Sequence, residues 1–267
     1  MIDDLCKVVI AELDIHTFVE TGLFEGETIS LVSRWFSELH PDFGDIESML
    51  LSESSGVNPW NTRIPFPIFA ETSKKSEYQL ISVELDEERA QKGRALFDNN
   101  PNISIVKQSS EEFMDIFVDE LSGKSEKREG VFFYLDAHWN EYWPIKEEIQ
   151  AIDRLDQYVL CVDDFFVPGR PEFGFDVYQG LPCSWKTLSP WFRDSEVQIY
   201  YPFRSNRDNR GWVLIFKGYS TQSLSFLDSL PLWRWKSWKS KSNPQELRRE
   251  ARRTLKTIKK MLTGRRN

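Results

Sequence analysis

The segment 17–28 (TFVETGLFEGET) most constrains what this chain can fold into. An apolar run leads into a turn that contains Gly22 and Gly26, and a helical pattern with apolar residues at three- and four-residue steps follows. This order predicts a buried strand, a tight turn and the N-terminus of a helix. Such a turn presents backbone N–H groups and the positive end of a helix dipole to a polar ligand, and Gly22 lets the backbone approach closely. A plain structural turn is the alternative.

Strand and helix patterns alternate along the first two thirds of the chain. Strands are expected at 17–21, 79–84, 103–106, 131–136 and 158–163, and helices at 2–15, 26–39, 86–98, 110–121 and 143–156. Strand–helix–strand units of this spacing form parallel sheets with right-handed crossovers. The continuous apolar runs of the fourth and fifth strands are typical of central strands that are buried on both faces.

The remaining third predicts how the sheet ends. A helical stretch broken near Gly180 and Pro182 is expected over 176–193. Strands at 197–201 and 212–216 follow, separated by a polar turn that is too short for a helix, so these two are expected to be antiparallel. The sequence therefore predicts an α/β fold, a Rossmann-like, doubly wound, mostly parallel sheet of seven strands with an antiparallel last strand.

Two segments fall outside this alternation. Residues 40–77 are rich in Pro and Gly and delay the return to the second strand, so they are expected to be an insertion, either a lid or a surface loop. The second segment is a C-terminal extension over 231–267. The domain that carries the activity is accordingly expected over 1–230.

The C-terminal extension is strongly basic. Residues 232–267 hold 13 Lys+Arg and 2 Asp+Glu, whereas the whole chain has a net charge of -8. Trp233, Trp235 and Trp238 stand among these basic residues, and an amphipathic helix is expected after Pro244. A basic amphipathic helix next to Trp and Lys predicts a peripheral anchor on an anionic membrane surface. Docking on the acidic body and nucleic-acid binding are the alternatives.

Polar residues stand at the carboxyl end of every expected parallel strand. They are Glu20 and Thr21, then Glu84, then Gln108 and Ser109, then Asp136 and His138, and finally Asp163 and Asp164. Ligands of open parallel sheets bind at this edge, so the set predicts one binding site there. Glu84 stands where an acid accepts hydrogen bonds from the ribose hydroxyls of a nucleoside.

Asp136, Asp163 and Asp164 are expected side by side, because they end neighbouring strands. Three clustered carboxylates repel one another and would have raised pKa values without a cation, and all-oxygen ligands suit Mg²⁺. Such an ion lowers the pKa of a bound hydroxyl and orients it. One structural acid with solvated neighbours is the alternative.

The pattern E-x-G-x-x-x-G-x-T, from Glu20 to Thr28, resembles motif I of class I S-adenosylmethionine (SAM)-dependent methyltransferases. It lacks the central glycine of the nicotinamide-binding pattern G-x-G-x-x-G. The resemblance, which covers residues 15–217, implies a SAM site formed by Glu20, Thr21, Gly22, Phe24, Gly26, Thr28, Glu84, Ser109 and Asp136. In that site Glu84 would hold the ribose, and Ser109 or Ser110 would lie beside the adenine.

Tyr134-Leu-Asp-Ala-His138 and Val162-Asp-Asp-Phe165 resemble the metal motifs of Mg²⁺-dependent sugar O-methyltransferases of the macrocin O-methyltransferase kind. The resemblance implies that the three acids of these motifs hold Mg²⁺. Those enzymes carry a further acid two residues after the first, thought to be the base, where this chain has His138. Imidazole can take a hydroxyl proton, so the predicted catalytic residues are His138, Asp136 and Asp164. Orienting Asp136 or ligating a softer metal are the other roles open to His138.

The implied activity is SAM-dependent O-methylation of a hydroxyl, on a saccharide or glycolipid, with divalent metal assistance. An RNA or other small-molecule methyltransferase and a non-catalytic SAM-binding scaffold are the alternatives. No secretory signal or long apolar run is present, and the three Cys residues are widely spaced. These features predict a cytoplasmic protein that is membrane-peripheral through its extension.

Overall fold

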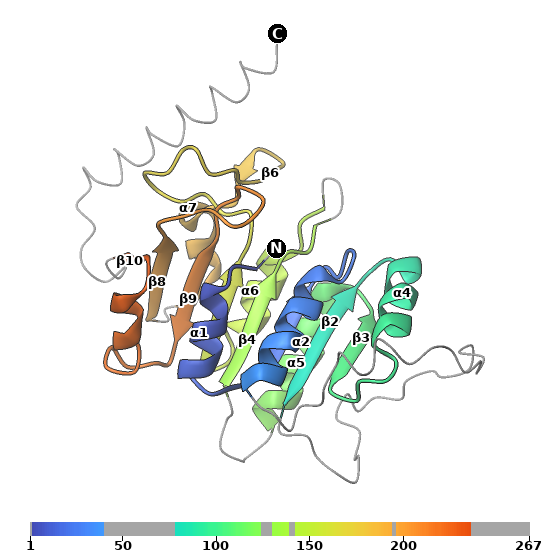
Figure 1. Ribbon diagram of the computed structural model, residues 1–267. Helices are drawn as coiled ribbons and strands as arrows, with labels where there is room; N and C mark the ends of the chain where they lie inside the picture. Colours follow the sequence, from blue (N-terminus) through green and yellow to red (C-terminus); the bar gives the residue numbers. More distant parts are fainter. Residues whose placement is uncertain (1, 40–77, 124–129, 139–141, 194–195, 236–267) are drawn as a thin grey trace.

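The computed structural model describes residues 2–39, 78–123, 130–138, 142–193 and 196–235 (Figure 1). The predicted insertion at 40–77 and most of the basic extension, with Trp238 and its amphipathic helix, lie outside the described residues. In the described part, no helix has both the length and the apolar character needed to cross a membrane.

An eight-stranded sheet forms the centre of the fold, in the order β10-β8-β9-β5-β4-β1-β2-β3. Its strands are β1 (Ile15–Thr21), β2 (Gln79–Glu84), β3 (Ile103–Lys107), β4 (Gly130–Leu135), β5 (Tyr158–Val162), β8 (Val197–Pro202), β9 (Val213–Lys217) and β10 (Leu232–Trp235). The first five strands pair in parallel, while β9 runs antiparallel between β5 and β8. The predicted Rossmann-like, mostly parallel sheet with an antiparallel strand near its end is confirmed.

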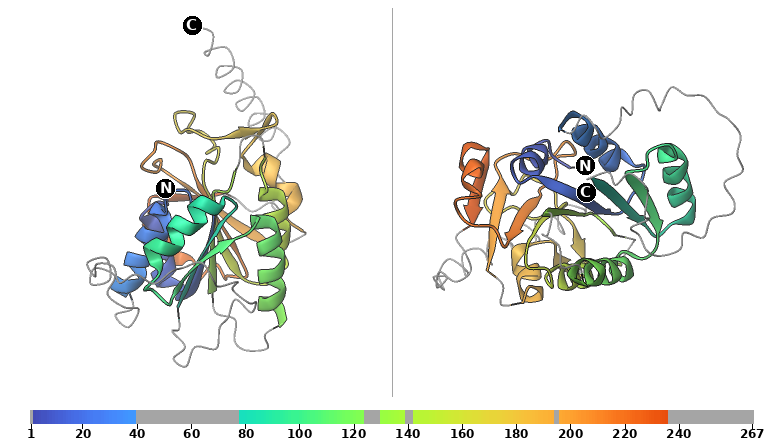
Figure 2. Two further views of the ribbon diagram at one scale, coloured as in Figure 1. Left: turned by 90° about the vertical axis from the view of Figure 1, so that its right-hand side faces the viewer. Right: turned by 90° about the horizontal axis from the view of Figure 1, so that it is seen from below.

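Helices cover both faces of the sheet (Figure 2). One face carries α1 (Leu5–Glu12), α2 (Glu27–Leu39), α4 (Glu87–Phe97) and η3 (Ser225–Ser229), and the other carries α5 (Ser110–Gly123), α6 (Ile145–Ile152), α7 (Trp185–Leu188) and η2 (Ser189–Trp191). The strand residues alternate between the two cores: Phe132 faces the first and Phe133 the second, and both are fully buried. This burial on both faces explains the continuous apolar run of β4.

The helix predicted over 176–193 is wrong in its first half. Residues Val177–Tyr178 (β6) and Leu181–Pro182 (β7) form a short antiparallel hairpin, and only then does α7 begin. Gln179 and Gly180 both have positive φ, 50° and 79°, and such a pair makes the tight two-residue turn of a hairpin.

The eighth strand was not predicted, because its residues were assigned to the basic extension. In β10 the alternating pattern Leu-Trp-Arg-Trp pairs with β8 and exposes Arg234. Trp233 and Trp235 lie on the opposite side to Arg234 and pack around Tyr201, with ring centroids 4.7 and 6.0 Å away. These two partly buried indoles therefore pack against the core of the domain.

Candidate active site

A cleft of about 720 Å³ opens at the carboxyl ends of the parallel strands. Most of the predicted site residues line it together: Gly22, Phe24, Thr28, Glu84, Ser109, Asp136, His138, Asp163 and Asp164. The strand order reverses between β1 and β4, and ligands of open α/β sheets bind at such a switch point. The cleft has the size and place of a small-molecule binding site.

The glycine turn after β1 lies against the end of β4. Gly22 has a φ of 87°, and a Cβ there would lie 3.0 Å from the carbonyl oxygen of Asp136. Its N–H donates to the carbonyl oxygen of Val83, at 2.9 Å, so the turn is also tied to β2. Phe24 follows with a φ of 49° and an exposed ring, over which the guanidinium of Arg89 lies 4.9 Å from the centroid. A side chain at position 22 would therefore press on the β4 backbone and strain the positive φ, so glycine is favoured there.

Glu84 ends β2 and faces the glycine turn. Its carboxylate accepts hydrogen bonds from the backbone N–H groups of Phe24, at 3.2 Å, and Asp86, at 2.8 Å. Glu84 therefore lines the cleft and holds the glycine turn at the same time.

Three predicted cofactor residues lie beneath the cleft and do not line it. Glu20 is fully buried within β1, where one carboxylate oxygen accepts from Ser82 Oγ at 2.6 Å. Burial raises the pKa of Glu20 to about 8. Thr21 is buried on the opposite face, and Gly26, with a φ of 76°, packs under the turn against Leu23. Glu20 and Thr21 point to the faces of the sheet and not to its edge, as side chains within a strand do, whereas Gly26 lies in the turn, where its N–H donates to the carbonyl oxygen of Leu23.

Asp136, His138 and Asp164 converge in the cleft. One ligand atom from each lies within 4.8 Å of the others. Burial, followed by the charges of Asp163 and Asp164, raises the pKa of Asp136 well above its usual range. Two carboxylates and an imidazole at this separation fit a divalent cation, which would relieve that repulsion.

Asp163 departs from the predicted metal triad. Its buried carboxylate accepts hydrogen bonds from the hydroxyl of Tyr134, at 2.5 Å, and from Nδ2 of Asn206, at 3.0 Å. Both partners hold the side chain among the strands, and it is His138 that completes the converging group. The sequence does not indicate which of the adjacent acids, Asp163 or Asp164, forms these hydrogen bonds in the interior.

Arg210 was missed by the sequence analysis, which treated its segment as a polar turn. Its Nε donates to Asp164 Oδ1 at 2.5 Å, and its Nη2 donates to Asp176. Asp176 also accepts from the hydroxyl of Tyr178, at 2.6 Å. Arg210 thus joins the β8–β9 connection to the acid cluster, a contact between distant segments that no local pattern signals.

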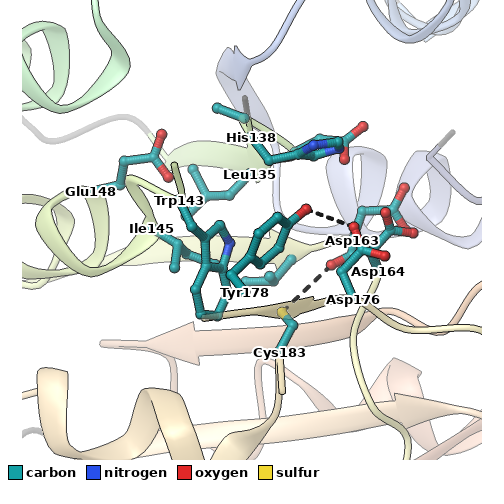
Figure 3. A pocket seen from close by; sticks show the side chains of 13 residues that line it. Leu135, His138, Trp143, Ile145, Glu148, Asp163, Asp164, Asp176, Tyr178 and Cys183 are labelled. Atoms are coloured by element: carbon teal, nitrogen blue, oxygen red, sulfur yellow. Dashed lines mark hydrogen bonds between the residues drawn. The ribbon is translucent and has the colours of Figure 1, made fainter. Parts of the chain in front are cut away.

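Glu148 is a second missed residue. Its side chain lies on α6 and is fully buried. It lines a small cavity of about 10 Å³, which has room for roughly one water molecule. Asp163 and Asp164 line the same cavity on the side opposite to Glu148 (Figure 3). Burial raises the pKa of Glu148 to about 7, an effect that the hydroxyls of Ser110 and Thr21 oppose. The sequence does contain a signal for this buried acid, because Glu148 stands beside Ile149 in the apolar stripe of its helix.

No protein-family model matches this chain, and no curated protein is similar to it in sequence. Among solved structures it is similar to an O-methyltransferase from Bacillus cereus in complex with SAH (8% identity, TM-score 0.48, covering 80% of this chain and 79% of that one). It is also similar to the O-methyltransferase TomG from Streptomyces achromogenes, involved in tomaymycin synthesis, in complex with SAM (12% identity, TM-score 0.46, covering 81% and 79%). A third similar structure is the 23S rRNA methyltransferase ErmE (12% identity, TM-score 0.39, covering 86% and 75%). At these identities and TM-scores, any assignment of function rests on the site of this chain itself.

Proposed function

We propose that this chain is a class I SAM-dependent O-methyltransferase that methylates a hydroxyl group with the help of a divalent cation. The observation that carries the proposal is the single cleft in which the glycine turn, Glu84 and Ser109 meet Asp136, His138 and Asp164. One end of this cleft has the groups that bind a nucleoside, and the other has the groups that bind and deprotonate a hydroxyl.

The residues divide between these two tasks. Glu84 holds the ribose, Ser109 lies beside the adenine, and the turn at Gly22, with Thr28, receives the methionine part. SAM supplies the methyl group, which passes to the hydroxyl oxygen by in-line displacement, so the protein mainly has to position the two reactants. Asp136, His138 and Asp164 stand where that hydroxyl would be oriented and lose its proton, with a bound cation lowering its pKa.

For the acceptor we propose a saccharide or glycolipid, from the likeness of the two acid motifs to those of sugar O-methyltransferases. The basic extension would then bring a cytoplasmic enzyme to an anionic membrane surface. Binding to phosphatidylserine-containing vesicles that is lost when the chain is shortened to end at Trp235 would support this. Binding of the extension to RNA with a steep salt dependence, and none to vesicles, would favour an RNA acceptor instead.

Calorimetric titration with SAM tests the assignment. We expect micromolar binding to the parent protein and about tenfold weaker binding to Glu84→Gln, because a charged acceptor for two hydroxyls is lost. Glu87→Gln changes a nearby acid on the exposed side of α4 and should bind like the parent. Absence of SAM binding to the folded parent protein would overturn the proposal. Binding without methylation of any saccharide, lipid or RNA acceptor would indicate the scaffold alternative.

A further inference from the structure

We infer that Asp136, His138 and Asp164 bind a divalent transition-metal ion, of the Mn²⁺ or Co²⁺ class, in preference to Mg²⁺. The inference deepens the proposed function and rests on it for the role of the ion. The ligand set itself rests on the geometry of the three side chains.

The proposed ligands are two carboxylates and one imidazole. Asp136, His138 and Asp164 offer atoms within 4.8 Å of one another, a separation at which one ion can bind all three. Asp163, the neighbour of Asp164 in sequence, is not part of this converging group. Its carboxylate is shared between the Tyr134 hydroxyl and the Asn206 amide in the protein interior.

The side chains around these ligands are mainly acidic. Asp136, Asp163, Asp164 and Asp176 gather here, and within the described residues Arg210 is the one Lys or Arg that pairs with any of these acids. Arg210 contacts Asp164 and Asp176, so Asp136 keeps a half-buried carboxylate to which no described side chain donates a hydrogen bond. A divalent cation bound here would balance negative charge of this group and give the Asp136 carboxylate a partner.

The imidazole of His138 indicates which kind of ion the group prefers. The His138 ring lies on the same side of the small cavity as the acids and next to Tyr178, with ring centroids 5.7 Å apart (Figure 3). An imidazole nitrogen is a poor ligand for Mg²⁺, which selects oxygen, but a good one for first-row transition metals. Three protein ligands at the edge of an open cleft also leave positions for the substrate oxygen. As a ligand, His138 would not be free to act as the base predicted from the sequence, and the proton of a hydroxyl bound to the cation would pass to water in the open cleft.

Titration of the metal-free protein with Co²⁺, Mn²⁺ and Mg²⁺ alone tests the inference. We expect one ion per chain, with Co²⁺ bound at least about tenfold more tightly than Mg²⁺. Asp136→Asn should abolish this binding. His138→Asp, which creates an all-oxygen set, should lower the affinity for Co²⁺ and raise that for Mg²⁺, so that the ratio falls or reverses.

Asp163→Asn is the matched control, because it changes an acid of the same cluster that is held by Tyr134 and Asn206. It should lower the melting temperature and keep the metal stoichiometry. The inference is overturned if Co²⁺ and Mg²⁺ bind equally, if His138→Asp leaves their ratio unchanged, or if Asp163→Asn removes metal binding. SAM titrations without metal separate this result from the proposed function, since either one can fail while the other stands.

Discussion

A Cβ atom on Gly22 would lie 3.0 Å from the carbonyl oxygen of Asp136. This close approach joins the turn after β1 to the end of β4, where the strand order of the sheet reverses. Gly22 and Asp136 also line the cleft proposed for the cofactor, so a change in the backbone at Gly22 should change cofactor binding.

Gly22→Ala should therefore weaken SAM binding by at least about tenfold and lower stability by about 1–2 kcal/mol, because the new methyl group meets the β4 backbone. Gly169→Ala is its control: Gly169 has a φ of 80°, but a Cβ there meets no atom within 4 Å. The control shares the strain of a positive φ and should bind SAM normally. Equal SAM affinity of the two variants in calorimetry would contradict a role for the close approach.

Glu148 should make the protein less stable as the pH rises. Its folded pKa of about 7 lies above the usual 4.5, so between these values the unfolded chain releases its proton while the folded one keeps it. Stability attributable to this group is thus highest below pH 4.5, falls between about pH 4.5 and 7, and stays low above that. Glu148→Gln should flatten this slope and add on the order of 3 kcal/mol at pH 8. Urea unfolding between pH 5 and 8 checks the prediction, and an unchanged slope would refute it.

Arg210→Met should leave Asp164 and Asp176 facing each other without their common cation. We expect a loss of about 2 kcal/mol in the free energy of unfolding, since the pairs are partly buried. Arg207→Met is the comparison, because Arg207 pairs with Asp4 at 3.5 Å with both side chains well exposed, and it should change stability by about 0.5 kcal/mol or less. Denaturant midpoints of the two variants that do not differ would show that Arg210 is not needed for the loop.

Shortening the chain should locate the end of the folded domain. A chain that ends at Trp235 keeps β10, whereas one that ends at Leu230 loses that strand and the packing on Tyr201. We expect the shorter chain to melt about 5 °C or more below the longer one. Trp233→Ala in the full chain should reproduce part of this loss, about 2 kcal/mol. If both shortened chains melt together, β10 contributes nothing to the domain.

The sequence by itself determined the α/β class, the five parallel strands and the edge at which polar residues gather. These features depend on local periodicity and on the rule that parallel strands end on one side, and both can be recognised in a single chain. It also placed Gly22, Glu84, Asp136 and His138 in one site, because each follows directly from a strand end.

Tertiary structure alone decided which of these residues face the cleft and which partners they have. The buried carboxylate of Glu20 accepts a hydrogen bond from Ser82, and that of Asp163 accepts hydrogen bonds from Tyr134 and Asn206. Arg210, which follows Asp164 by 46 residues in the sequence, donates a hydrogen bond to it. Hydrogen bonds between residues this far apart depend on how the layers pack, which strand and helix periods do not encode. For the same reason Trp233 and Trp235, which look like tail residues in the sequence, pack against the core, because their partner Tyr201 lies on a different strand.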